Sequence, residues 1–354
     1  MQHKAKHLLF LILSTVILSS TVFSQLTTVK SVTENSVTLK LEIPKSVLSI
    51  IVVREISSKQ IMPDAKIKYK PNVSIGSKEK QSLTGEGNYV VYSGAVSQEI
   101  SIKGLKPGIA YKAEVYKFNK KDKSTTLVTA FDIGVLASEP KTQAKVTAFS
   151  GIKSDEFTIH FKWGDGKSRI ILVSEANECD PPKDGTIYAA SNMFGKGSLT
   201  TKSTHVVLND SSVAKTVTVK GLKPAKKYFV VICEANGSGY SVNYNTNLPK
   251  PQGGTTTLAE PPVALEAADI TESSFLAKWK GADGATRYNI EVAFDEKFTK
   301  FVEEYKSVDV GKIESILIED LPKAENFFYR LQAIGPNGKE SQYSNVIKVS
   351  VKNK

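Results

Sequence analysis

The chain has 354 residues, with 47 Lys and Arg against 36 Asp and Glu and a formal net charge of +11. This length exceeds one ordinary domain and predicts two or three, and two cysteines are too few for a zinc knuckle. The lysines alternate along predicted strands and do not cluster with aromatic residues, so we expect a solvated surface and no nucleic-acid partner.

Residues 1–24 are predicted to be a secretory signal peptide. Lys4 and Lys6 precede an apolar run of about 11 residues, whereas a bilayer span needs roughly 20. Val22-Phe23-Ser24 offers a cleavage site, which makes Gln25 the first mature residue. An uncleaved anchor is the alternative. We expect a chain that is secreted or placed at the cell surface or in the periplasm, with no membrane span after cleavage.

Residues 25–143 are predicted to form the first of three all-β modules. Apolar side chains alternate from Val37 to Ile43, as in a strand with one buried face. Ser49 to Glu55 is denser in apolar residues and predicts a strand buried on both faces. A long stretch rich in Lys, Ser, Gly and Pro, residues 57–88, then precedes a further strand at Tyr89 to Tyr92.

The same corner between two strands occurs three times in the sequence. Gly104-Leu-Lys-Pro is followed by Tyr111, Gly221-Leu-Lys-Pro by Tyr228, and a looser copy places Phe327 six residues after a Leu. Gly and Pro form the turn, and we expect each ring to be buried, with a tyrosine hydroxyl bonding to upstream backbone. Phe327 has no hydroxyl, so module three is expected to lack one hydrogen bond, about 1 kcal/mol.

The second and third modules are predicted at residues 144–260 and 261–354. Phe157 to Trp163 and Arg169 to Glu175 repeat the first two strands of module one. Module three is shorter, its start is marked by Glu260-Pro-Pro, and it has an alternating strand from Phe275 to Trp279. Length differences between the copies belong in loops, as in other repeat proteins.

These motifs resemble fibronectin type III repeats. The segments Val52-Val-Arg-Glu and Tyr89-Val-Val-Tyr, with the Gly-Leu-Lys-Pro corner, are similar to a long variant found in exported proteins of Bacteroidetes-type bacteria. The resemblance implies an all-β fold class, with three tandem fibronectin type III-like (immunoglobulin-like) β-sandwiches after the signal peptide. It is specific for a fold and not for an activity.

The residues that could support catalysis or metal binding do not form a recognisable site. His160 is expected to face solvent from a strand, and His205 to have a structural role. Gly166-Lys167-Ser168 lacks the first glycine of a phosphate loop and is interpreted as a turn. The alternating Asn243, Asn245 and Asn247 are neutral and lack the Gly and Glu of a calcium loop.

Two carboxylate pairs, Asp295-Glu296 and Glu303-Glu304, could be compared with glycosidase acids. Adjacent residues on a strand face opposite ways, so we interpret both pairs as part of a solvated edge. We therefore expect no catalytic residue, no metal and no cofactor.

Two features remain open from the sequence. Cys179 and Cys233 could form a disulfide in an exported chain, but the predicted strands place them apart unless the intervening loop folds back. The loop containing Tyr240 and Tyr244 could bind a ligand, because tyrosine offers contact area at low entropic cost. Turn formation and strand packing explain the same residues, and we favour that interpretation.

The sequence therefore predicts an exported, non-enzymatic binding or scaffold protein. Its expected partner is a protein or glycan of unknown identity, met in adhesion or interaction at the cell envelope or outside the cell. The alternatives are an accessory carbohydrate-binding subunit of a polysaccharide-degrading system and a hydrolase with an unrecognised site.

Overall fold

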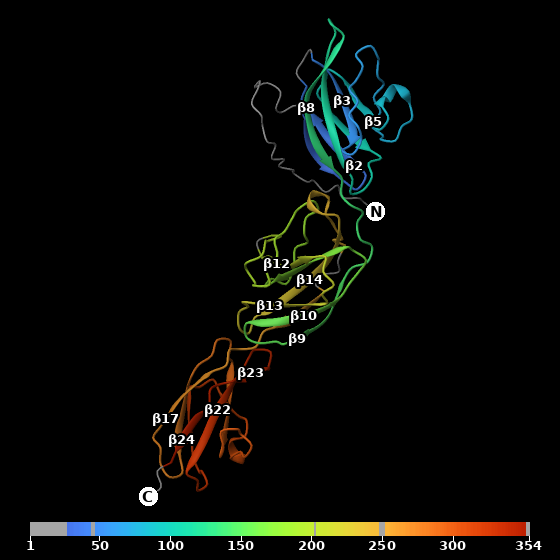
Figure 1. The fold of residues 1–354 in the computed structure, drawn as a ribbon. Coiled ribbons are helices and arrows are strands. Elements are labelled where there is room, and N and C mark those ends of the chain that lie inside the picture. The colour runs from blue at the N-terminus through green and yellow to red at the C-terminus, as the bar shows by residue number, and fades with distance from the viewer. Residues whose placement is uncertain (1–26, 44–46, 202, 248–251, 352–354) are drawn as a thin grey trace.

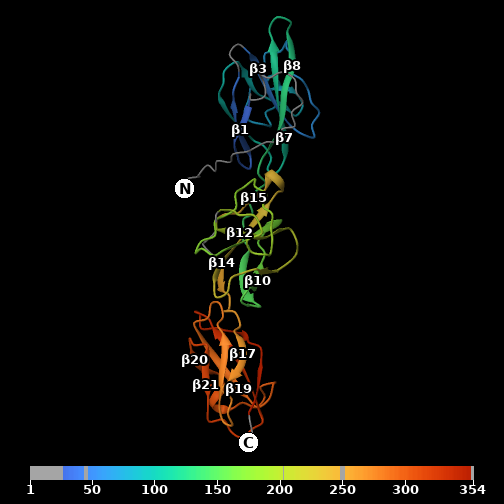
Figure 2. The ribbon, with the colours of Figure 1, turned by 90° about the vertical axis from the view of Figure 1, so that its left-hand side faces the viewer.

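A computed structural model of the chain describes residues 27–43, 47–201, 203–247 and 252–351. The predicted signal peptide, residues 1–24, lies outside these ranges. The described strands form three successive pairs of antiparallel sheets, arranged end to end along an elongated molecule (Figures 1 and 2). This confirms the prediction of an all-β chain built of three tandem β-sandwiches.

Module one contains a three-stranded and a five-stranded sheet, in the orders β1-β2-β6 and β4-β5-β3-β7-β8. Its elements are β1 (Thr27–Val32), β2 (Ser36–Leu41), β3 (Leu48–Glu55), the 3-10 helix η1 (Lys80–Ser82), β4 (Leu83–Gly85), β5 (Asn88–Gly94), β6 (Glu99–Lys103), β7 (Ala110–Asn119) and β8 (Ser124–Gly134).

Module two repeats this arrangement, with sheets β13-β10-β9 and β12-β11-β14-β15, where β16 also pairs with β14. Its elements are β9 (Lys145–Ser150), β10 (Glu156–Lys162), β11 (Ser168–Ser174), β12 (Thr204–Asp210), β13 (Thr216–Lys220), β14 (Lys227–Asn236), η2 (Gly239–Ser241), β15 (Asn243–Tyr244) and β16 (Gly253–Thr256).

Module three has sheets β17-β18-β21 and β20-β19-β22-β23, where β24 also pairs with β22. Its elements are β17 (Val263–Ala268), β18 (Phe275–Lys280), β19 (Arg287–Ala293), η3 (Glu303–Tyr305), β20 (Val308–Gly311), β21 (Ser315–Ile318), β22 (Asn326–Ile334), β23 (Glu340–Tyr343) and β24 (Ile347–Ser350). Glu303 and Glu304 therefore lie on a 3-10 helix and not on the strand assumed from the sequence.

The period-two pattern of the strands explains the core of each sandwich. In β2, Val37, Leu39 and Leu41 are almost fully buried and face the other sheet, while the residues between them are more exposed. Apolar area removed from water stabilises such a core at about 25 cal/mol per Å². The same alternation occurs in β10 and β18.

Strand β3 is buried on both faces because a third layer covers its outer side. Ile51 and Val53 point into the core between the sheets, whereas Ile50 and Val52 pack with Tyr69 on the opposite face. Tyr69 belongs to the long insertion between β3 and β4. In module two, Tyr188 of the corresponding insertion covers the outer face of β11 in the same way.

The insertions also occupy one edge of the smaller sheet in each of the first two modules. Ser74 forms a parallel bridge with Lys103 of β6, and Met193 forms the same bridge with Lys220 of β13. Unpaired sheet edges favour intermolecular pairing, so this cover protects the edge. The sequence predicted only a loop here, since neither insertion has a regular apolar period.

Candidate functional site

The three corners place a buried ring at the end of each sandwich. The hydroxyl of Tyr111 accepts a hydrogen bond from the backbone N–H of Lys106 at 2.9 Å, and that of Tyr228 accepts one from Lys223 at 2.9 Å. Phe327 is fully buried at the equivalent position and cannot accept such a bond. Module three instead has Tyr329, whose hydroxyl bonds to Leu265 O and Lys278 O across the core.

Replacing Tyr228 by phenylalanine is expected to lower the free energy of unfolding of module two by about 1 kcal/mol, because the Lys223 N–H loses its acceptor. Burial raises the pKa of Tyr228, so the hydroxyl is neutral at physiological pH. Hydrogen exchange of β13 and β14 measures the effect. Tyr240→Phe is the control, since Tyr240 is half exposed, and an equal loss in both variants would contradict the role of the corner.

The loop with Tyr240 and Tyr244, for which the sequence favours turn formation and strand packing over ligand binding, docks onto module one. Tyr244 is 1% exposed and donates to Thr186 O at 3.2 Å, so it is not accessible to a ligand. The ring of Tyr240 lies against Gly134 at the end of β8, where an added Cβ would be 2.9 Å from it. The loop therefore belongs to the joint between the two modules.

Asparagine side chains make several of the polar contacts of this joint. Asn243 Nδ2 donates to Ala137 O at 2.7 Å and to Glu34 Oε1 at 3.2 Å, and Asn245 Nδ2 donates to Pro140 O at 2.7 Å. Both amides are at least 95% buried. Two of the three alternating asparagines that were compared with a calcium loop, Asn243 and Asn245, thus hydrogen-bond to the linker between the modules.

In this structure Cys179 and Cys233 are free thiols. Both side chains nevertheless pack in the same apolar cluster, because the insertion folds back over β14. The Cys179 thiol contacts Phe229 O at 3.4 Å. Burial raises the pKa of Cys179 to about 12 and also raises that of Cys233.

We expect both thiols to react slowly with iodoacetamide at pH 8 in the folded chain, because the reactive thiolate is scarce when the pKa is raised. Both should react at the rate of an ordinary cysteine after denaturation. Mass spectrometry of a labelling time course tests this. Equal rates in the folded and the unfolded chain would contradict it.

The two histidines and Asp295 make local contacts. His160 Nε2 lies 2.6 Å from Ser150 Oγ on the neighbouring strand, and the His205 ring packs against Phe194 at 4.5 Å. Asp295 accepts bonds from the backbone of its own turn, including Lys300 N–H at 2.8 Å. In the described ranges, no three His, Cys, Asp or Glu residues could share a metal ion, and no helix there could span a membrane.

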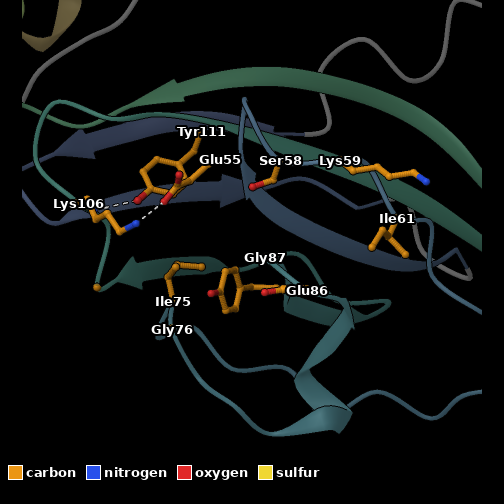
Figure 3. A pocket seen from close by; sticks show the side chains of 12 residues that line it. Glu55, Ser58, Lys59, Ile61, Ile75, Gly76, Glu86, Gly87, Lys106 and Tyr111 are labelled. Atoms are coloured by element: carbon orange, nitrogen blue, oxygen red, sulfur yellow. Dashed lines mark hydrogen bonds and ion pairs between the residues drawn. The ribbon is translucent and has the colours of Figure 1, made fainter.

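A cavity of about 630 Å³ opens beside the corner of module one (Figure 3). It lies between the end of β3, the insertion, the turn before β5 and the Gly104–Tyr111 corner. Its lining consists of Glu55, Ser58, Lys59, Ile61, Ile75, Gly76, Glu86, Gly87, Tyr89, Gly104, Lys106 and Tyr111. No motif in the sequence pointed to it, because these residues come from four separate segments.

Charged groups of both signs surround the cavity. Lys106 Nζ and Glu55 Oε1 form an ion pair at 2.7 Å beside Tyr111, as the dashed lines in Figure 3 show. The Glu55 pairing raises the pKa of Lys106, so the rim keeps its ammonium at neutral pH. Ser58 and Lys59 lie on the opposite side in the same view.

A buried ionic network fixes the loop that forms this opposite side. Arg54 Nε donates to Glu114 Oε1 at 3.0 Å, and the Arg54 guanidinium also donates to the carbonyls of Ile56 and Ser58. Tyr116 donates to the second oxygen of Glu114 at 2.7 Å. The rim of the cavity is thus held by groups in the protein interior.

No protein-family profile and no curated protein matches the chain. A structural search finds the FN1–FN3 domains of chicken CNTN1, with 12% identity, 92% of this chain and 97% of that chain covered, and a TM-score of 0.25. A superposition at this level supports no conclusion about either protein, so the assignment to three β-sandwiches depends on the strand pairing above.

Proposed function

We propose that the chain is an exported, non-enzymatic rod that holds a binding module at a fixed position at the cell envelope or outside the cell. The observation that supports this most directly is the hydrogen-bonded joint of Asn243 and Asn245, which fixes module two against module one. A rigid spacer presents a site at a set distance and orientation, and tandem modules add avidity on repeated partners.

Cell fractionation combined with external protease tests this proposal. The protein, blotted from native cells, is expected in the surface or medium fraction and should be removed by protease added outside. Confinement to the cytoplasm would contradict export, and confinement to the periplasm would contradict adhesion. A periplasmic marker protein is the control for intact cells.

The alternative function, an accessory carbohydrate-binding subunit, is favoured by one observation. The cavity of module one combines the partly exposed Tyr89 with hydrogen-bonding groups of both signs. Co-purification of the native protein with a polysaccharide-degrading enzyme would support this alternative over adhesion.

A further inference from the structure

The internal repeat of the chain shows which residue keeps the module-one cavity open. Ile75 N–H donates to Lys103 O at 2.9 Å, and Phe194 N–H donates to Lys220 O at 2.8 Å. In both modules the backbone N–H of the same lysine donates in turn to a carbonyl two residues earlier in the insertion. Lys103 donates to Val73 O, and Lys220 donates to Asn192 O. Ile75 and Phe194 are therefore structurally equivalent.

In module two the Phe194 ring fills the space beside the corner. Its centroid is 5.2 Å from the Tyr228 ring and 4.5 Å from the His205 ring, and both pairs are edge-on. Such aromatic pairs are stable arrangements of closely packed rings. The side chain at this position thus bridges the corner tyrosine and the first residues of β12.

In module one the equivalent rings are Tyr111 and Tyr89, and both line the cavity together with Ile75. Ile75 packs against the core but is too short to fill the space that a phenyl ring fills in module two. The next residue, Gly76, has a φ of 95° and nothing within 4 Å of an added Cβ, and its counterpart Gly195 is equally open at a φ of 82°, so the difference lies at Ile75.

We propose that this cavity binds one ring of a neutral, polyhydroxylated ligand, a sugar residue of a glycan. The inference rests on the proposed binding role and names its ligand class. The volume of about 630 Å³ lies within the range of small-molecule sites, roughly 300–1,000 Å³. A sugar ring has apolar C–H faces and hydroxyl edges, and the cavity offers a partner for each.

The apolar part of the cavity is formed by Tyr89 and Ile75, whose side chains are only partly buried. The polar part contains two carboxylates, Glu55 and Glu86, and two ammonium groups, Lys59 and Lys106. A carboxylate accepts up to about four hydrogen bonds and an ammonium donates three, so the ion pair of Glu55 leaves capacity for hydroxyls.

The balance of charge favours a neutral ligand over an anionic one. The four ionic groups of the lining are two of each sign, and one pair is already formed between Glu55 and Lys106 at 2.7 Å. An anion would gain one ammonium contact for each carboxylate that repels it. Hydroxyl groups bond favourably to both.

The repeat supplies a matched pair of variants for the test. Ile75→Phe places in module one the ring that fills this space in module two, and Phe194→Ile makes the reverse change in module two. Tyr89→Ala removes the aromatic face, whereas Tyr89→Phe keeps it. Each full-length variant is first checked for unchanged circular dichroism and thermal unfolding, so that loss of binding is not loss of fold.

The probe is an array of immobilised neutral hexose and N-acetylhexosamine oligosaccharides, with sialylated and sulfated oligosaccharides alongside, followed by calorimetry on the best neutral binder. The wild type, Phe194→Ile and Tyr89→Phe are expected to bind. Ile75→Phe and Tyr89→Ala are expected to lose about tenfold or more in affinity, as when a central contact is removed.

Three results would overturn the inference: no binding of any neutral glycan, binding of acidic glycans alone, or neutral binding that survives Ile75→Phe. The last result would leave the proposed binding role in place while moving the site elsewhere. The protease test of export is independent of all three, so failure of the site and failure of the proposed function are told apart.

Discussion

Replacing Arg54 by methionine is expected to destabilise module one by about 3–5 kcal/mol, because the buried Glu114 carboxylate is left without its partner. Glu114 is 1% exposed, and Arg54 is 9% exposed. The carbonyls of Ile56 and Ser58 lose a donor as well, so the rim of the cavity should loosen with the fold.

Hydrogen exchange of the β3 and β7 amides in the full chain measures this loss. Tryptophan fluorescence would not, since Trp163 and Trp279 lie in the other two modules. Lys112→Met is the control within the same sheet, because the Lys112–Asp132 pair is exposed and such pairs contribute roughly 0–1 kcal/mol. An equal loss of unfolding free energy in Arg54→Met and Lys112→Met would show that the Arg54–Glu114 pair is not shielded from water.

A second substitution distinguishes the destabilisation caused by the unpaired Glu114 carboxylate from that caused by lost packing. Adding Glu114→Gln to Arg54→Met removes the unpaired carboxylate and keeps an acceptor for the Tyr116 hydroxyl. Burial raises the pKa of Tyr116 to about 12, so this hydroxyl remains a donor at neutral pH. The double variant should therefore recover part of the stability lost in Arg54→Met, and no recovery would point to packing alone.

Strand positions and the three corners could be predicted from the sequence because both depend on local patterns. The alternation in β2 and β10 marks one buried face, and the Gly-Leu-Lys-Pro turn with Tyr111 or Tyr228 fixes how two strands meet. The dense strand β3 was also predicted to be buried on both faces. The sequence did not show what covers its outer face.

The insertions could not be placed from the sequence because their contacts are long-range. Tyr69 and Tyr188 each dock a segment without regular period, and each hydroxyl accepts a backbone bond from five residues upstream. The cavity was missed for a related reason. It depends on the size of a single side chain, Ile75 against Phe194, at a position where the two insertions have little sequence in common.

The joint between modules one and two was likewise not recognised, since its partners are far apart in the chain. Asn243 bonds to Glu34 and Ala137, which precede it by 209 and 106 residues. An exposed Tyr-rich and Asn-rich loop and a docked one have the same composition. The docked loop is distinguished by its long-range contacts, the packing of Tyr240 against Gly134 and the bonds of Asn243 to Glu34 and Ala137.

The double variant Asn243→Ala/Asn245→Ala is expected to turn this joint into a flexible hinge. It removes three side-chain hydrogen bonds across the linker and leaves the carbonyls of Ala137 and Pro140 without these donors. Each lost bond costs about 1 kcal/mol. The population of the docked arrangement should therefore no longer greatly exceed that of arrangements in which the two modules are undocked.

Small-angle X-ray scattering and spin-label distances between modules one and two measure the change. The wild type should give a narrow distance distribution and the variant a broad one, with little change in the unfolding of either module. Asn209→Ala is the matched control, because Asn209 Nδ2 donates to Tyr188 O at 2.8 Å within module two and not across the joint. A distribution as narrow as that of the wild type would mean that the remaining contacts suffice, namely Tyr240 against Gly134, Ala137 N–H to Ser241 O at 2.8 Å and Asn236 Nδ2 to Ser138 O at 2.8 Å. The rigid rod would then not depend on Asn243 and Asn245.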